Sequence, residues 1–191
     1  MKHFSDLSLC SRLQSNLAKH GFVQPTPVQA QAIPPALAGR DVVATAQTGT
    51  GKTLAFLLPL LQSLEGGHGR KGVQAVILSP TRELAMQTDE SFTRIAAGTG
   101  IKASLVVGGM SEVHQLRGVR QGAKVLIATP GRLCDFLERR LVNLGDVRFF
   151  VLDEADRMLD MGFLPALRAI LKTVPAGRQT LLFSATIEKS V

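Results

Sequence analysis

Three carboxylates close a run of apolar residues in the segment FFVLDEAD, residues 149–156. Asp153, Glu154 and Asp156 fall within four positions, although the chain as a whole carries a formal charge of +7. Carboxylates this close repel one another, so the grouping indicates a cation that they share. The alternative is a helix N-terminus that carries acidic residues, which the helix dipole favours by itself.

A second segment offers phosphate chemistry. AQTGTGKT, residues 46–53, lies between an apolar run and a helix-like stretch, which is the context of a P-loop. Backbone N–H groups of such a turn cradle phosphates at the positive end of the following helix. Ala46 stands where a P-loop usually has its first glycine, and an ordinary turn before a helix is the alternative. The residues expected to contact nucleotide are Ala46, Gln47, Thr48, Gly49, Thr50, Gly51, Lys52 and Thr53.

The two segments predict complementary roles. We expect Lys52 to reach the β- and γ-phosphates and the Thr53 hydroxyl to ligate Mg²⁺. Asp153 would hold the same Mg²⁺ through a coordinated water. Glu154 would orient or deprotonate the water that attacks the γ-phosphate. Asp156 lies three residues beyond Asp153, and we expect it to bond to another part of the protein.

Alternating strand-like and helix-like segments must position these residues. The helix-like segments lie near 52–64, 82–97, 111–120, 131–139 and 163–173. The strand candidates are 41–46, 73–79, 102–108, 124–129, 147–153 and 179–185. Apolar runs without strict alternation indicate strands buried on both faces. The order predicts an α/β fold, a parallel sheet covered by helices, with the ligand site at the carboxyl edge of the strands.

The first 40 residues follow a different pattern. They predict two helices, near 8–20 and 27–37, around the turn HGFVQPTP. Residues 65–72, EGGHGRKG, resemble a loop. The length of 191 residues suits one domain with a full core.

Composition limits the function classes. A pI near 10 favours a polyanionic partner such as nucleic acid. The two cysteines form no metal or disulfide pattern, so we expect a reducing, cytoplasmic location. The longest apolar run, residues 54–61, is too short to span a bilayer, and we expect no membrane partner.

Together, AQTGTGKT and DEAD resemble the DEAD-box family of ATP-dependent RNA helicases, and the likeness covers nearly all of the chain in the family's motif order. The resemblance implies a RecA-like P-loop domain with a mostly parallel sheet and helices on both faces. It implies ATP or ADP with Mg²⁺ as ligands. Residues 1–40 would be adenine-recognition helices within the same domain, and residues 41–191 the RecA-like ATP-binding part.

The segment GFVQPTPVQ, residues 21–29, is similar to the family's adenine-recognition motif. The resemblance implies that Gln29 reads adenine through two hydrogen bonds. Phe4, seventeen residues before Gly21, matches the upstream aromatic residue that stacks on the base. The alternatives are a core contact for Phe4 and a surface helix position for Gln29.

Three further segments, PTRELA, GG and TPGR, are similar to the family's RNA-contacting segments. They would grip phosphates and 2′-hydroxyls without reading sequence. For Arg82 the alternative is an internal salt bridge at a helix start. The resemblance also implies that Ser184 and Thr186 of SAT couple nucleotide state to RNA separation through hydroxyl bonds to Asp156. The implied RNA-binding residues are Pro80, Thr81, Arg82, Gly108, Gly109, Thr129, Pro130, Gly131 and Arg132.

The family core has a second RecA-like domain, which these 191 residues do not include. The resemblance places arginine fingers and the other wall of the ATP and RNA sites on that domain. We therefore expect this chain to bind adenine nucleotide but to turn it over slowly. Two alternatives are a DNA-dependent P-loop translocase and a non-catalytic nucleotide-binding module.

Overall fold

Six parallel strands form the central sheet. The computed structural model describes residues 1–47, 49–65 and 72–186, and its strands lie in the order β1-β6-β5-β2-β4-β3. All five neighbouring pairs are parallel, as expected. The strands are β1 (Val42–Thr45), β2 (Ala75–Leu78), β3 (Ala103–Val106), β4 (Val125–Ala128), β5 (Phe149–Asp153) and β6 (Gln179–Ser184).

The central strands are apolar throughout because both of their faces are buried. In β2, Ala75 and Ile77 belong to one hydrophobic cluster, whereas Val76 and Leu78 belong to the cluster on the opposite face. Successive side chains of a strand point to opposite faces, so one strand contributes to both cores.

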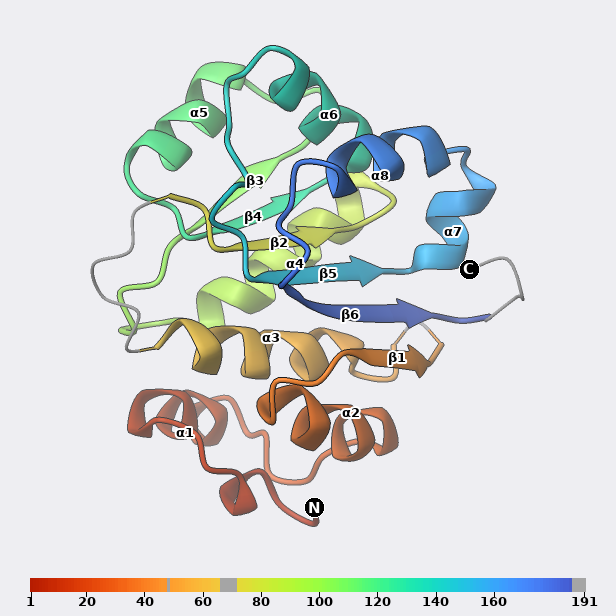
Figure 1. The fold of residues 1–191 in the computed structure, drawn as a ribbon. Helices are drawn as coiled ribbons and strands as arrows, with labels where there is room; N and C mark the ends of the chain where they lie inside the picture. Colours follow the sequence, from red (N-terminus) through yellow and green to blue (C-terminus); the bar gives the residue numbers. More distant parts are fainter. Residues whose placement is uncertain (48, 66–71, 187–191) are drawn as a thin grey trace.

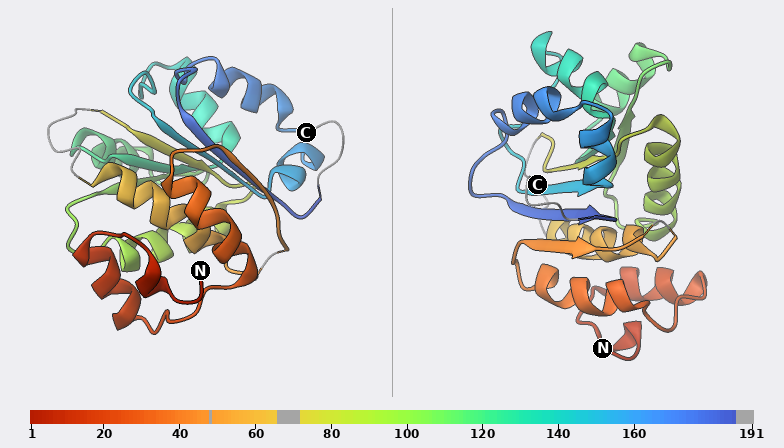
Figure 2. Two further views of the ribbon diagram at one scale, coloured as in Figure 1. Left: turned by 60° about the horizontal axis from the view of Figure 1, so that its bottom comes forward. Right: turned by 90° about the vertical axis from the view of Figure 1, so that its right-hand side faces the viewer.

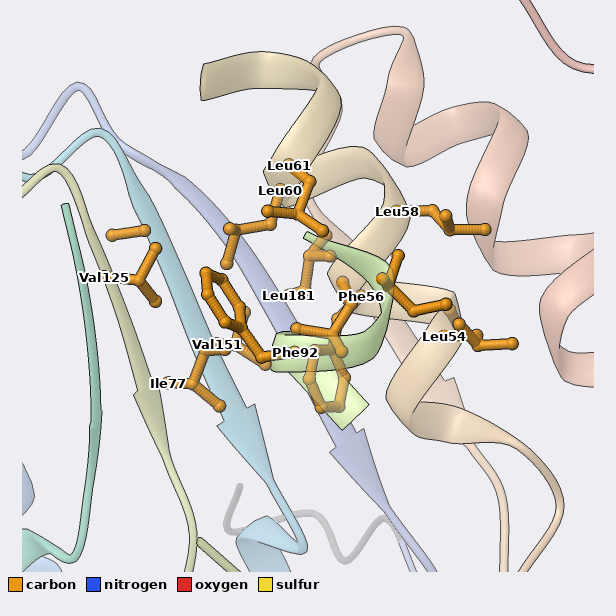
Figure 3. Packing of buried hydrophobic residues seen from close by; sticks show 14 of the residues in the cluster. Leu54, Phe56, Leu58, Leu60, Leu61, Ile77, Phe92, Val125, Val151 and Leu181 are labelled. Carbon is orange, nitrogen blue, oxygen red and sulfur yellow. The ribbon is translucent and has the colours of Figure 1, made fainter. Parts of the chain in front are cut away.

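Four helices cover the first face: α1 (Ser11–Lys19), α2 (Pro27–Leu37), α3 (Lys52–Leu64) and α4 (Arg82–Ile95). Helix α3 lies between the sheet and the outer layer of α1 and α2 (Figure 1). The ring of Phe56 packs edge-on against Phe183 of β6, with centroids 5.5 Å apart, while Leu58 faces the outer helices (Figure 3). Burial on all sides explains why α3 is apolar around its whole circumference.

The other face carries α5 (Glu112–Arg120), α6 (Pro130–Glu138), α7 (Ala155–Asp160) and α8 (Leu164–Leu171). Figure 2 shows these helices on the side of the sheet away from α1 and α2. The expected α/β fold with helices on both faces is confirmed. Helix α7 was not predicted, because six residues directly after a strand are too few for a helical period to be visible. A short 3₁₀ turn, η1 (Phe4–Asp6), was also not predicted.

The N-terminal helices share the core of the sheet domain. Leu13, Leu17 and Ile33 are fully buried in the same cluster as the sheet residues. The buried Asn16 side chain donates to the backbone oxygens of Ile95, at 2.7 Å, and of Ala97, at 2.8 Å. Helix α1 therefore satisfies carbonyl groups at the C-terminal end of α4, which the helix itself leaves unpaired. No helix in the described part of the chain is long and apolar enough to cross a membrane.

Candidate functional site

The parallel strands bring the predicted segments to one edge. The P-loop follows β1, PTRELA follows β2, GG follows β3, TPGR follows β4, DEAD spans the end of β5, and SAT begins at the last residue of β6. All strands point the same way, so these connections lie at the carboxyl edge of the sheet (Figure 1). A single edge thus carries every predicted segment that follows a strand.

The P-loop turns through two left-handed glycines. Gly49 has a φ of 84° and Gly51 a φ of 91°, a region that other residues rarely adopt. Gly51 precedes Lys52, the first residue of α3. The unpaired N–H groups of this first helical turn thus lie beside the loop, as phosphate binding requires. The predicted contact Thr48 lies outside the described residues.

Gln29 holds the P-loop to helix α2. Its side chain is 4% exposed, its Oε1 accepts from the Thr26 N–H at 2.8 Å, and its Nε2 donates to the Gly51 oxygen at 3.0 Å. A Cβ atom at Gly51 would collide with the same Nε2, so the close approach also needs glycine. Both ends of the amide have partners within the protein, and Gln29 is not the surface residue considered as an alternative. Its reading of adenine stays a prediction, for which the amide retains one N–H and one oxygen lone pair beyond these bonds.

Phe4 lies in the hydrophobic core. Its side chain is 2% exposed, and its ring packs edge-on against Phe22 at a centroid distance of 6.5 Å. In this structure Phe4 therefore makes the core contact that was considered as its alternative role. Stacking on a base stays a prediction, and it would require the ring of Phe4 to become accessible.

Lys52 meets Asp153 and Glu154 in a buried cluster. Lys52 Nζ lies 3.9 Å from Asp153 Oδ1 and 3.5 Å from Glu154 Oε1, and all three side chains are below 10% exposed. Within the described part of the chain, Lys52 Nζ and Asp153 Oδ1 make no hydrogen bond. Buried charged groups are normally hydrogen-bonded. Lys52 Nζ and Asp153 Oδ1 can therefore still bind a ligand.

The cluster changes the proton affinity of Asp153. Burial raises the pKa of Asp153 to about 6, the positive charge of Lys52 lowers it, and the neighbouring Glu154 raises it further. Asp153 Oδ1 makes no hydrogen bond among the described residues, so it is the carboxylate oxygen of the cluster that a cation could contact.

Arg157 completes the cluster and was not predicted. Its Nη1 lies 3.3 Å from Glu154 Oε2, across three positions at the start of α7. Glu154 itself has a φ of 57°, a left-handed conformation that is uncommon for a residue other than glycine. The pairing of residues three apart on a helix would have indicated Arg157 had α7 been predicted.

The chain's own side chains form only part of a metal site. Among the described residues, no group of three or more histidine, cysteine, aspartate or glutamate side chains is placed to hold a metal. Mg²⁺ commonly takes one or two protein ligands and completes its octahedron with phosphate oxygens and waters. Asp153 Oδ1, which is buried and makes no hydrogen bond, fits that pattern, and Thr53, the second residue of α3, would add a hydroxyl.

Asp156 connects DEAD to SAT, and the hydroxyl contacts expected for it are present. Asp156 Oδ2 accepts from the N–H of Ala185 at 3.1 Å, from the N–H of Thr186 at 3.0 Å and from Thr186 Oγ1 at 3.1 Å. The Asp156 N–H donates to Ser184 Oγ at 3.3 Å. Burial opposes ionisation, but bonds from the Arg157 and Thr186 N–H groups hold the pKa of Asp156 below its ordinary value. The role of this contact in coupling stays a prediction.

Arg82 joins two of the three predicted RNA-binding segments. Its exposed guanidinium donates from Nη1 to the Gly109 oxygen at 3.4 Å. Among the described residues it pairs with no carboxylate, so the internal salt bridge considered for it is not found. Thr81 caps the same helix by accepting from the Leu84 N–H. The glycines at 108 and 109 are exposed beside this guanidinium.

Arg132 has partners within the protein. It lies 3.0 Å from Asp135 and 3.4 Å from Glu112, and its guanidinium stacks 4.6 Å from the ring centre of Phe136. Arg139 binds the same two carboxylates at 3.2 Å and 2.7 Å. The positive charge of Arg132 is therefore largely balanced before any ligand binds, and a direct phosphate contact from it stays a prediction. The rest of TPGR leads into helix α6, which begins at residue 130.

A family model described as "DEAD/DEAH box helicase" matches residues 26–191. The chain belongs to this family. It is 45% identical over 188 residues to the DEAD-box ATP-dependent RNA helicase CshA of Streptococcus pneumoniae, covering 98% of this chain and 36% of that protein. It is 44% identical over 191 residues to the ATP-dependent rRNA helicase RRP3 of Candida albicans, covering 100% of this chain and 35% of that protein.

A solved structure agrees with this DEAD/DEAH box assignment. A DEAD box protein from the hyperthermophile Methanococcus jannaschii superposes with a TM-score of 0.93 at 34% sequence identity, covering 100% of this chain and 52% of that one. The expected RecA-like fold is confirmed. The chain spans about a third of the length of the curated relatives described above.

Because the Asp153 carboxylate is buried, we expect the free energy of unfolding of this chain to depend on pH. The pKa of Asp153 in the folded protein, about 6, exceeds its ordinary value of 3.8. Protonated Asp153 therefore stabilises the folded state at low pH, and this contribution is lost as pH rises through about 6. Without nucleotide and metal, Asp153→Asn should stabilise the protein at pH 7.5. The gain over the wild type should shrink by about 1–2 kcal/mol by pH 4.5.

Urea denaturation at the two pH values, in the presence of a chelator, measures this difference. Asp160→Asn changes an exposed carboxylate at the C-terminal end of α7 and serves as the control. A gain from Asp153→Asn that is the same at both pH values would show that Asp153 is ionised at an ordinary pKa.

Proposed function

We propose that this chain is the ATP-binding N-terminal half of a DEAD-box RNA helicase core. In the full-length protein it would couple ATP hydrolysis to RNA duplex unwinding. The observation that carries the proposal is the buried Lys52, which faces Asp153 and Glu154 beside the P-loop. The names of the relatives support the same activity, since CshA and RRP3 are both called ATP-dependent RNA or rRNA helicases.

The proposed ligand is ATP or ADP with Mg²⁺. Lys52 would move from its carboxylate partners to the β- and γ-phosphates, and the P-loop N–H groups would hold the same phosphates. Thr53 and Asp153 would hold Mg²⁺, which when bound neutralises charge on the phosphates. Glu154 would orient or deprotonate the attacking water, and Arg157 would fix its position. Gln29 and Phe4 are proposed to recognise the adenine base.

The proposed second ligand is RNA, bound through its backbone. Arg82, Gly108 and Gly109 present a guanidinium and exposed backbone at the carboxyl edge of the sheet. Groups of this kind grip phosphates and sugars without reading bases. The net charge of +7 favours such a polyanion. A DNA-dependent translocase is the second candidate, and stronger stimulation of the full-length protein's ATPase by DNA than by RNA would favour it.

The remaining features of the proposal concern organisation. Residues 1–40 would be the adenine-recognition part and residues 41–191 the RecA-like part of one domain. A second RecA-like domain of the same protein would be the partner that closes the ATP and RNA sites, and the greater length of the relatives supports this. A cytoplasmic location is part of the proposal, and fractionation of cells that express the full-length protein would test it.

The chain alone should hydrolyse ATP very slowly, with or without RNA. In related phosphoryl-transfer enzymes an arginine finger contributes about 10³–10⁵ in rate, and the proposal places these arginines on the second domain. Steady-state phosphate release with Mg²⁺·ATP, in the presence and absence of single-stranded RNA, measures this activity. Strong stimulation by RNA would show that the catalytic site is complete within the 191 residues. Failure to bind any adenine nucleotide would contradict the proposal.

Arg82→Ala should weaken RNA binding several-fold. Loss of one phosphate contact should also reduce the slope of log affinity against log salt by about 0.7. Arg94→Ala removes the same charge from the other end of α4, where Arg94 is exposed beside Glu90, and should change the slope little. Fluorescence anisotropy with a labelled oligouridylate at several salt concentrations compares the two. Equal losses in both variants would show that Arg82 contributes only to the net charge.

A further inference from the structure

Gln115 is a buried polar side chain that the proposed function does not yet use. It lies on the first turn of α5 and is 5% exposed. Its Oε1 accepts from the Val107 N–H at 3.2 Å, and its Nε2 donates to the Val107 oxygen at 2.9 Å and to the Met110 oxygen at 3.2 Å. All three partners are backbone groups of the loop that joins β3 to α5.

The position of β3 explains why these groups need a partner. β3 is the last strand of the sheet and pairs only with β4 among the described strands. Val107 directly follows the last residue of β3 and is fully buried. The amide of Gln115 binds both polar groups of Val107, as a neighbouring strand would do, and so prevents an unpaired buried N–H and C=O.

The same amide fixes both ends of the glycine pair. Gly108 and Gly109 lie between Val107 and Met110. The three bonds of Gln115 therefore hold the residue before and the residue after the exposed glycine pair. Gly109 has a φ of 73° and directs its oxygen to Arg82. Two adjacent glycines have more conformational freedom than any other pair of residues, and ordering them costs correspondingly more free energy.

The backbone of Gln115 is itself held in place by hydrogen bonds to β3 and within α5. Its own backbone oxygen accepts from Ser104 Oγ of β3 at 2.9 Å, and its N–H donates to the Ser111 oxygen. A Cβ atom at Gly118, one turn further along α5, would collide with the same serine hydroxyl, which places α5 close against β3. The packing of α5 against β3 therefore fixes the backbone from which the Gln115 side chain extends.

We propose that Gln115 is a positioning residue for RNA binding, which holds the Gly108–Gly109 backbone in the conformation that meets the phosphate chain. This inference rests on the proposed function, because it assumes that the glycine pair contacts RNA. Gln115 does not touch RNA itself. It removes an ordering cost that the loop would otherwise meet when RNA binds.

Gln115→Met tests the proposal, because methionine has a similar volume and forms none of the three bonds. The affinity for a labelled single-stranded oligouridylate should fall about tenfold at low salt. The affinity for ADP should stay unchanged, because the P-loop lies at the other end of the sheet. Gln121→Met, an exposed position at the far end of α5, is the matched control and should leave both affinities unchanged.

Hydrogen exchange and NMR distinguish positioning from general destabilisation. In Gln115→Met, exchange of the Val107 amide should become faster and the Gly108 and Gly109 signals should shift or broaden, while the P-loop signals stay in place. Unchanged RNA affinity in Gln115→Met, or an equal loss of RNA and ADP affinity, would overturn the inference. No RNA binding by the wild type would instead overturn the proposed function, and the inference with it.

Should Gln115→Met fail to fold, the wild-type protein decides the question. The side-chain amide protons of Gln115 should exchange slowly in both the free and the RNA-bound protein. Protection that disappears when the oligouridylate binds would show that the loop leaves Gln115 in the bound state, which contradicts the proposal.

Discussion

The contact of one buried lysine with two buried carboxylates is the interaction on which the site depends. Lys52 contacts Asp153 and Glu154, Arg157 pairs with Glu154, and Asp153 Oδ1 is left without a hydrogen bond away from water. Burial without full pairing is costly, and the raised pKa of Asp153 expresses that cost. Under the proposed function, a bound cation and phosphates would supply the missing partner of Asp153.

The rest of the structure keeps this cluster in place. Helix α3 begins with Lys52 and is buried on all sides, so its first turn cannot shift without disturbing two layers of packing. Glu154 directly follows β5, which lies between β6 and β2. Two glutamine side chains hold loops at the same edge of the sheet. Gln29 binds the P-loop from α2, and Gln115 binds the glycine pair from α5. Buried amides suit this purpose, since they bind backbone without adding charge.

The sequence predicted the sheet well because its strands are short apolar runs, and each observed strand lies within its predicted range. The P-loop and DEAD were also predictable, since their spacing implies their chemistry. Most contacts between distant segments were not predictable, although the resemblance implied that of Asp156 with SAT. The pairing of Arg132 with Glu112 and the loop contacts of Gln115 depend on how helices pack, which no local pattern reveals. Helix α7 was missed because it is too short to show a period.

The most direct test of the central claim is the affinity for ADP, measured by calorimetry with Mg²⁺ and with a chelator in the wild type and in Asp153→Asn. If Asp153 helps to bind Mg²⁺ beside the phosphates of ADP, Mg²⁺ should strengthen ADP binding to the wild type about tenfold. This corresponds to about 1.4 kcal/mol of binding free energy. The same addition should have little effect in Asp153→Asn. An equal effect of Mg²⁺ on both proteins, or none on either, would contradict the account.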